Sequence, residues 1–351
     1  VKAGHTFGGW YSDAELNTLV TSIPATQTGD VTLYAKFTAT GYSISYELDG
    51  GTNDTSNPTG YTYGVGVVEG GFKAPVKEGH TFDGWYSDAE FNTPVTSISA
   101  TQTGDVILYA KFTANSYSIS YELDGGTNDV TNPTGYIYGV GVAGFADASK
   151  PEHTFVGWYS DAEFNTAVTS ISTTHTGEVK LYAKFTANSY SISYELDGGT
   201  NDATNPTGYT YGVGVAGFAD ASKPEHTFVG WHSDAEFNTP VTSIPATQTG
   251  DVKLYAKFTA NSYSISYELN GGTNDAANPT SYTYGVGVAG FAAASKAEHT
   301  FAGWYSDAEF NTPVTSIPAA QTGDVTLHAK FTPNSYTITY VLDGGSNAVS
   351  N

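Results

Sequence analysis

The sequence contains no cysteine, no methionine and no arginine, and 13 lysines are its only basic side chains besides histidine. Without cysteine, neither a disulfide nor a thiolate metal site can form. Against the lysines stand 35 acidic residues, so the formal net charge is −22. Nucleic-acid binding requires clustered basic residues that displace counterions from phosphate, and anionic lipid attracts the same residues. We therefore exclude nucleic acid and anionic lipid surfaces as partners.

Long apolar runs are absent as well. A membrane-spanning helix needs about 18 or more consecutive apolar residues, and no such stretch occurs. No secretory leader is recognisable either. We therefore predict no membrane insertion within this segment, and the acidic excess favours solubility and repulsion between neighbouring parts of the chain.

Repetition is what the sequence has in abundance. The stretch GHTFDGWYSDAEFNTPV, which begins at Gly79, recurs with small changes from Gly4, Glu152, Glu225 and Glu298. The five tryptophans follow at spacings of 75, 73, 73 and 73 residues. A period of this length is large enough for a small domain. The sequence predicts the later part of a repeat at 1–40, complete repeats at 41–115, 116–188, 189–261 and 262–334, and the first strand of a further repeat at 335–351.

Strand patterns dominate each repeat. In residues 117–123, YSISYEL alternates apolar and polar positions strictly, as a half-buried strand does. TFVGWYS and GEVKLYAKF predict two more strands, and YIYGVGV predicts a short one that Gly139 and Gly141 weaken. DAEFNTAV has room for one helical turn at most. We therefore predict small, mostly β modules with little helix.

The modules follow one another closely. Only TANS separates the closing strand of one repeat from the first strand of the next. So short a linker limits swivelling, and we expect an elongated rod. The chain begins and ends within a repeat, so we expect it to be a segment of a longer tandem array.

The order of these motifs resembles a known family. YSISYELDGGTN, then HTFVGWHSDAEFNTPV, then GDVKLYAKF is similar to the Listeria–Bacteroides repeat, also called the internalin-type B repeat, and the similarity extends over each full copy. His153 stands where the family usually has tyrosine, and Phe185 where it has the final tryptophan. The resemblance implies a β-grasp-like module, strung in tandem on bacterial surface or secreted proteins as a spacer or an adhesion segment. It supplies no catalytic site.

Histidines near carboxylates are the strongest hint of chemistry. His80, His153, His226 and His299 recur, and Asp88 or Glu90 lies a few residues after the first of them. General acid–base catalysis needs such a pair in a pocket that holds substrate. A module of this size leaves little room for one, and a histidine packed at a strand edge is the simpler reading. We predict no enzyme, no catalytic residue and no cofactor.

Two further patterns have both a chemical and a structural interpretation. DGGTND, at 124–129, offers oxygen ligands for Ca²⁺ but lacks the full loop spacing and the distant glutamate; a turn explains it better, so we predict no metal site. Lys184 lies among aromatics and, with Asn165 and a nearby acid, invites a lysine–asparagine crosslink. A solvated strand lysine is the interpretation that we favour.

Exposed aromatic faces leave ligand binding open. Tyr159 is replaced by His232 in the next copy, and Val156 by Val229, Asp83, Gly8 or Ala302 in the others, so we expect these positions to be exposed. Weak adhesion survives such variation because avidity sums over copies.

The function that we predict is a stiff structural stalk on a bacterial cell surface or in an extracellular fibre. The alternative is a multivalent adhesin that binds host or matrix glycans or proteins. A third reading is a filament subunit, in which the strand at 336–342 of one chain completes residues 1–40 of the next.

Overall fold

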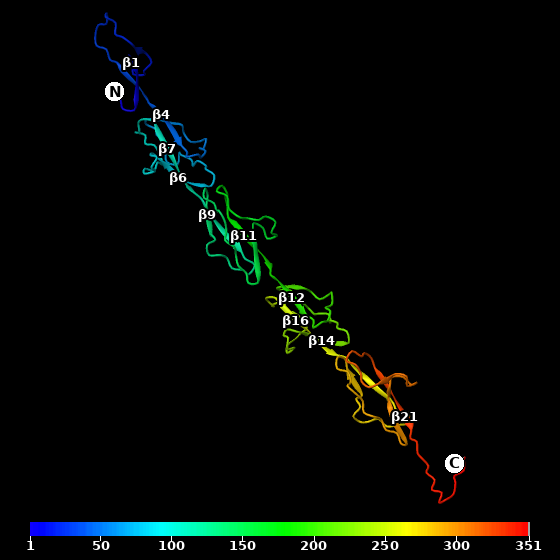
Figure 1. Cartoon of the computed structure of the whole chain (residues 1–351). Helices are drawn as coiled ribbons and strands as arrows, with labels where there is room; N and C mark the ends of the chain where they lie inside the picture. Colours follow the sequence, from blue (N-terminus) through cyan, green and yellow to red (C-terminus); the bar gives the residue numbers. More distant parts are fainter. Residues whose placement is uncertain (350–351) are drawn as a thin grey trace. The chain divides into compact units, whose positions relative to one another are not determined.

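A computed structural model describes residues 1–349 of the chain (Figure 1). All regular elements in this range are β-strands, so the mostly β class predicted from the sequence is confirmed. Among the described residues there is no helix of the length and apolar character needed to cross a membrane. The chain divides into two compact units, of which the first ends at Thr186 and the second begins at Ala187.

The four complete repeats share one set of strands. Each opens with a seven-residue strand: β4 (Gly41–Glu47), β8 (Ser116–Glu122), β12 (Ser189–Glu195) and β17 (Ser262–Glu268). A three-residue strand follows: β5 (Gly60–Thr62), β9 (Gly135–Ile137), β13 (Gly208–Thr210) and β18 (Ser281–Thr283). The tryptophan strand is next: β6 (His80–Tyr86), β10 (His153–Tyr159), β14 (His226–His232) and β19 (His299–Tyr305). Two repeats add a two-residue strand, β15 (Pro240–Val241) and β20 (Pro313–Val314). The closing strand has nine residues: β7 (Val106–Ala114), β11 (Val179–Ala187), β16 (Val252–Ala260) and β21 (Val325–Pro333).

The sheet of each repeat is built around a parallel pair. In residues 189–261 the strand order is β13-β12-β16-β14-β15. The opening strand β12 and the closing strand β16 run parallel, with Ile192 opposite Val252. Strand β14 is antiparallel to β16, and a bulge lies between Phe228 and Gly230. The order second–first–fourth–third around a parallel pair is that of a β-grasp sheet, here without a helix in the described chain.

The connection between consecutive repeats is shorter than the sequence indicates. Strand β7 runs to Ala114 and β8 begins at Ser116, so Asn115 alone lies between them. The four-residue linker that we predicted is wrong because Ala114 pairs with His80 inside the sheet. The carbonyl of Asn115 accepts the N–H of Tyr138 at 2.9 Å. The linker residue is therefore itself bonded to the repeat that follows.

Each complete repeat encloses its own hydrophobic cluster. In residues 116–188 the buried members come from all four strands and two loops: Ile119, Tyr136, Ala148, Trp158, Ile171, Leu181 and Ala183. Corresponding clusters occupy the other three complete repeats. A buried tryptophan hides roughly 150–250 Å² and contributes about 4–6 kcal/mol at about 25 cal/mol per Å². Aromatic burial therefore offsets the small size of each module.

A buried asparagine fastens two loops of the repeat to this core. Asn132 is 7% exposed, and its amide makes two bonds to the backbone of Ala146, accepting from N–H at 2.7 Å and donating to C=O at 3.0 Å. Its Nδ2 also donates to Asn128 at 2.7 Å. The indole Nε1 of Trp158 donates to the same carbonyl of Ala146 at 3.0 Å. The loops and the core tryptophan are thus joined, and the amide–backbone pair recurs at Asn57, Asn205 and Asn278.

Residues 1–40 show what a repeat loses without its first strand. They form β1 (His5–Tyr11), β2 (Leu19–Val20) and β3 (Tyr34–Ala39) in the order β2-β1-β3. Trp10 is 46% exposed, whereas its counterparts in the complete repeats are 3–4% exposed. The first strand and the loops after it therefore cover most of the tryptophan.

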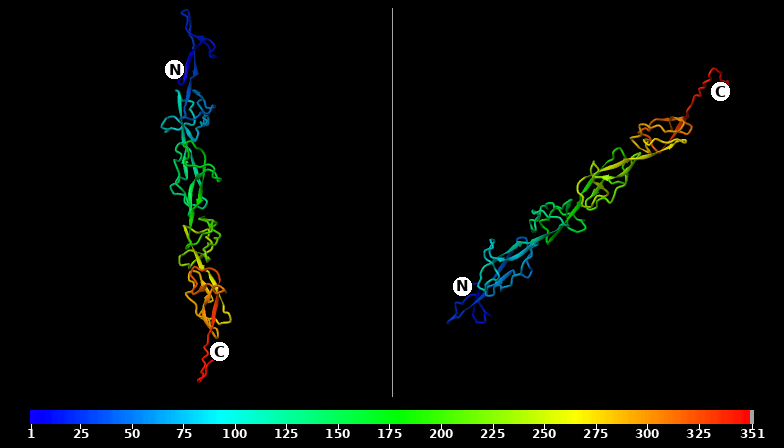
Figure 2. Two further views of the ribbon diagram at one scale, coloured as in Figure 1. Left: turned by 45° about the vertical axis from the view of Figure 1, so that its right-hand side comes forward. Right: turned by 90° about the horizontal axis from the view of Figure 1, so that it is seen from below.

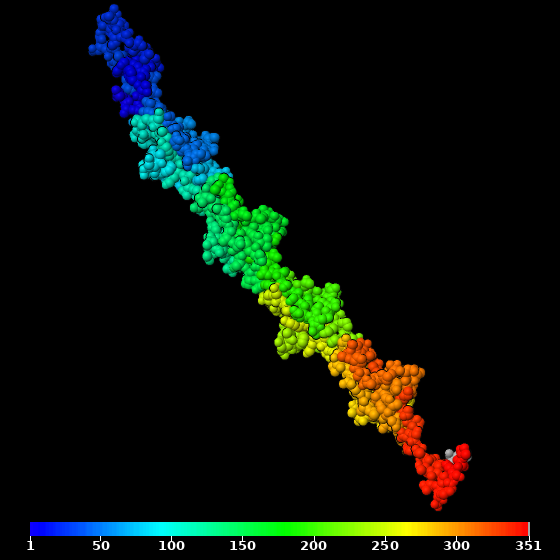
Figure 3. Space-filling model, viewed as in Figure 1, coloured from blue at the N-terminus to red at the C-terminus, as the bar shows by residue number. Residues whose placement is uncertain are grey.

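The segment after β21 does not form the strand that its sequence predicts. Residues 335–349 contain no strand, and Ile338 is 74% exposed; the rest of the predicted range, 350–351, lies outside the described residues. Its counterpart Ile119 is 5% exposed because it pairs with Val179 of a closing strand. Within the described residues no closing strand pairs with this last segment. The segment leaves the end of β21 as a tail (Figure 2), and it is uncovered on the face that Figure 3 shows.

Candidate functional site

The loop SDAEFNT is held by a single aspartate in every repeat. The carboxylate of Asp161 accepts the N–H of Asn165 and of Thr166, each at 2.9 Å. These bonds lower the pKa of the Asp161 carboxyl, and the backbone N–H of Asn165 has the largest effect. Phe164, inside the loop, adopts a left-handed backbone with φ of 58°. The loop is therefore a side-chain-capped turn and not the helical turn that the sequence allowed.

An aromatic clamp holds the lysine of the closing strand. The Nζ of Lys184 lies 5.2 Å from the ring centre of Tyr159 and 5.4 Å from that of Phe164. The two rings meet edge to face at 5.5 Å. The prediction of a solvated lysine is therefore wrong: Lys184 is half-buried and makes cation–π contacts. Asn165, the proposed crosslinking partner, is exposed and donates its amide to Asp161 at 3.2 Å.

The recurrent histidines lie where one repeat meets the next. The Nδ1 of His80 is 2.8 Å from the carbonyl oxygen of Glu78, and because a carbonyl only accepts, Nδ1 carries the proton. The ring of His80 contacts Tyr138 of the following repeat edge to face at 5.3 Å. His226 and Tyr284 make the same contact at 5.8 Å. The packing role predicted for these histidines is confirmed at both junctions.

The structure does not bring the predicted histidine and carboxylates together. His80 is the first residue of β6, whereas Asp88 and Glu90 follow its other end. A seven-residue strand separates them by about 20 Å, at about 3.3 Å per residue. The side chain of Asp88 is also engaged, because it accepts the N–H of Asn92 at 2.9 Å and of Thr93 at 3.0 Å.

The DGGTND turn directs its carboxylates toward protein donors. Asp124 pairs with Lys150 at 2.9 Å, and Asp129 accepts the N–H of Thr131 at 2.8 Å and its hydroxyl at 2.5 Å. Within residues 1–349 no group of three or more histidine, aspartate or glutamate side chains is gathered to hold a metal ion. The geometry is that of a turn fastened by a salt bridge.

The positions that vary between copies do not all behave as the sequence indicates. Val156 is 48% and Val229 53% exposed, as expected. His232, which replaces Tyr159, is by contrast only 6% exposed, and its ring packs against Phe237 at 5.4 Å. The change from Tyr159 to His232 therefore exchanges one ring for another in the aromatic clamp. The prediction that this position is exposed is wrong.

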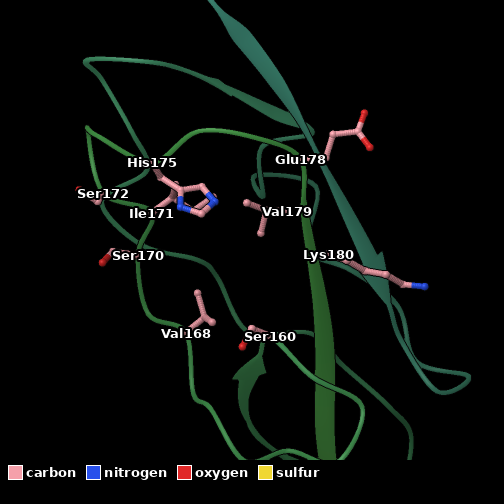
Figure 4. Close-up of a pocket in the computed structure, with 9 residues that line it drawn as sticks. All are labelled: Ser160, Val168, Ser170, Ile171, Ser172, His175, Glu178, Val179 and Lys180. Carbon is pink, nitrogen blue, oxygen red and sulfur yellow. The ribbon is translucent and has the colours of Figure 1, made fainter. Parts of the chain in front are cut away.

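A groove that the sequence did not reveal recurs in all four complete repeats. Its volume is between 300 and 390 Å³. In residues 116–188 it is lined by Ser160, Val168, Ser170, Ile171, Ser172, His175, Glu178, Val179 and Lys180 (Figure 4). The corresponding nine positions line the groove in the other three repeats. The groove lies between the start of the closing strand and the segment that follows the aspartate-capped loop.

One groove contains a histidine and a glutamate, which calls for a check of their geometry. Figure 4 shows the ring of His175 pointing into the hollow with Val168 and Val179, whereas Glu178 points away from it. The ring of His175 packs against Tyr136 at 5.9 Å. The other complete repeats have glutamine at the histidine position. The two groups therefore do not converge as an acid–base pair.

Comparison with known proteins gives one family. The chain matches the Listeria–Bacteroides repeat domain five times, over residues 1–36, 42–111, 117–184, 190–257 and 263–330. A putative Gly-rich membrane protein of Evansella cellulosilytica is 32% identical over 88% of this chain. A putative membrane protein of the same organism is 34% identical over 67%. Internalin H of Listeria monocytogenes is 33% identical over 42%.

These relatives are longer than the chain. The match spans 35% of each Evansella protein and 25% of internalin H. The shared part is therefore the repeat region.

Proposed function

The chain belongs to the Listeria–Bacteroides repeat family, and from that premise we propose that it is a stiff, non-enzymatic stalk of a bacterial surface protein. The observation that carries the proposal is the repeated construction: four complete repeats, each with its own core, follow one another with a single residue between strands. The names of the relatives, two membrane proteins and an internalin, support a place at the cell surface.

The junction supplies the stiffness in this proposal. The linker Asn115 accepts a backbone bond from Tyr138, whose ring also packs on His80. A Cβ on Gly79 would lie 2.2 Å from the same ring, so the tyrosine packs directly on the glycine. Rotation of one repeat against the next breaks these contacts. The charge of −22 keeps parallel stalks apart.

Distances between spin labels test the stiffness. The chain has no cysteine, so Ala89→Cys with Ala162→Cys places one label on the exposed loop of each of the two successive repeats that this junction joins. Ala89→Cys with Ala308→Cys spans four repeats. Double electron–electron resonance is expected to give a narrow distance distribution for the first pair. For the second pair we expect a mean distance between labels that is longer in proportion to the number of repeats between them. A broad distribution for neighbouring repeats would refute the stalk.

A further inference from the structure

The closing strands β7, β16 and β21 each extend beyond their antiparallel partner. Strand β16 begins at Val252, but its register with β14 ends at Tyr255, opposite His232. The residues between, through Leu254, pair with the parallel strand β12 on the other side. In the described part of the chain, these three residues of a central strand thus have a sheet partner on one side only. The groove runs along the other side.

The backbone of one residue faces this groove. Alternate residues of a strand turn their N–H and C=O groups to opposite sides. The hydroxyl of Ser193, on β12, lies 3.5 Å from the carbonyl oxygen of Val252, so Val252 faces β12 and Lys253 faces the groove. The same orientation follows at Lys180 and Thr326, where Ser120 and Ser266 contact the preceding carbonyl at 3.5 and 3.4 Å. Such backbone groups need a partner, either water or an added strand.

We propose that each groove binds an extended, positively charged segment of a partner protein, which adds a short strand to the open edge. The backbone at Lys253 supplies the donor and acceptor. Val241 and Ile244 form an apolar wall, and Ser233 and Ser243 add hydroxyls. A volume of 300–390 Å³ is at the small end of ligand sites and suits a few residues of peptide.

Charge selects the kind of segment. In residues 41–115 and 262–334 the only charged side chain lining the groove is Asp105 or Asp324. Each carboxylate accepts a backbone N–H of the opening strand at 2.8 Å, so its negative charge lies at the edge of the groove and not inside it. The lysine at the groove in residues 189–261 is neutralised by Glu195 at 2.6 Å. With a net charge of −22 on the chain, cationic segments are attracted and acidic ones repelled. Four grooves in one chain multiply a weak contact through avidity.

A blocked six-residue peptide of alternating lysine and valine, labelled with fluorescein, is the probe. Its anisotropy is measured against the full chain at low salt. Two matched peptides serve as controls: one carries N-methyl groups on alternate backbone nitrogens, and one has glutamine in place of lysine. We expect saturable binding of the parent peptide and a loss of at least about tenfold for each control, because each removes one of the two recognition elements.

Variants of the chain locate the site. Val95→Phe, Val168→Phe, Val241→Phe and Val314→Phe together fill the four grooves, and affinity is expected to fall at least about tenfold. The matched control changes the adjacent exposed residues, by Thr96→Phe, Thr169→Phe, Thr242→Phe and Thr315→Phe, and is expected to leave affinity unchanged. If the first variant unfolds, peptide-induced shifts of the amide resonances of Ile107, Lys180, Lys253 and Thr326 in the parent chain replace it.

Several outcomes overturn the proposal. They are no saturable binding, equal affinity for the N-methylated or the neutral peptide, equal affinity of the groove-filled variant, or unshifted amides at those four residues. Concentration-dependent self-association of the parent chain that the groove-filled variant lacks would assign the groove to a second copy, and displacement of the peptide by a neutral oligosaccharide would assign it to a glycan. None of these results bears on the stalk, because they measure binding and not the distances between repeats.

Discussion

Replacing Asn132 by alanine removes the amide that joins two loops to the core of one repeat. The variant loses two bonds to the backbone of Ala146 and one to Asn128. The carbonyl of Ala146 keeps its bond from Trp158, but its N–H is left without a protein partner. An unsatisfied buried donor costs about 1–3 kcal/mol, and each lost bond adds about 0.5–1.5 kcal/mol before solvent entry and relaxation. We expect the repeat to lose about 2–4 kcal/mol of stability.

Hydrogen exchange measured by mass spectrometry is the assay, because it reports each repeat separately. A loss of 2–4 kcal/mol corresponds to exchange about 30 to 1,000 times faster in the protected amides of 116–188. The amides of the other repeats are expected to keep their rates, since each repeat has its own core. The control Asn165→Ala alters an exposed amide with one side-chain bond of 3.2 Å, and less than a threefold change is expected. Equal acceleration in all repeats, or no acceleration in 116–188, would refute the reasoning.

Three further predictions concern titration and exposure. The pKa of Asp161 is lowered, so its carboxylate stabilises the fold at pH values above its ordinary pKa of 3.8, and this stabilisation is lost as the pH falls below that value. The difference in urea midpoint between the parent chain and Asp161→Asn should therefore become smaller from about pH 6 to about pH 2.5. A difference that stays constant with pH contradicts this. Burial raises the pKa of Tyr46 to about 12, so its stabilisation is present below about pH 10 and lost as the pH rises through 12. Burial also raises the pKa of its counterparts Tyr121, Tyr194 and Tyr267, so an ultraviolet titration should show several late-ionising tyrosines, and Tyr46→Phe should reduce the late absorbance change by one tyrosine. An unchanged late absorbance change would refute the assignment. Of the five tryptophans only Trp10 is substantially exposed, at 46%, so acrylamide should quench one emission component that Trp10→Phe abolishes; quenching that survives this change contradicts the burial pattern.

The strands were predictable from the sequence because alternation of side chains reports burial directly. YSISYEL and GEVKLYAKF gave β8 and β11 nearly to the residue. The linker was predicted too long because Thr113 and Ala114 have small side chains that do not continue the bulky pattern of the strand, yet both residues pair with β6. The strand predicted at 336–342 did not form because local pattern cannot supply the partner that a strand needs.

The features of the site depend on contacts across the chain and were therefore harder to predict. Asn132 and Ala146 are 14 residues apart and meet only after the loops fold. The clamp joins Lys184 to Phe164, whose left-handed backbone gives no signal in the sequence. The groove beside β16 arises from the register between β16 and β14, which a strand pattern does not fix. The recurrence of SDAEFNT was the one available signal, and it marked a rigid loop and not a reaction centre.

Stretching a single molecule tests most directly whether each repeat is an independently folded module of a stalk. One cysteine introduced at each end gives a unique attachment point, because the chain has none of its own. Each repeat of about 73 residues releases about 20–25 nm of chain when it unfolds, at about 3.3–3.6 Å per residue less its folded length. The account predicts four separate unfolding events of this size, one for each complete repeat. A single event that releases the four repeats together, or a gradual extension without events, would contradict it.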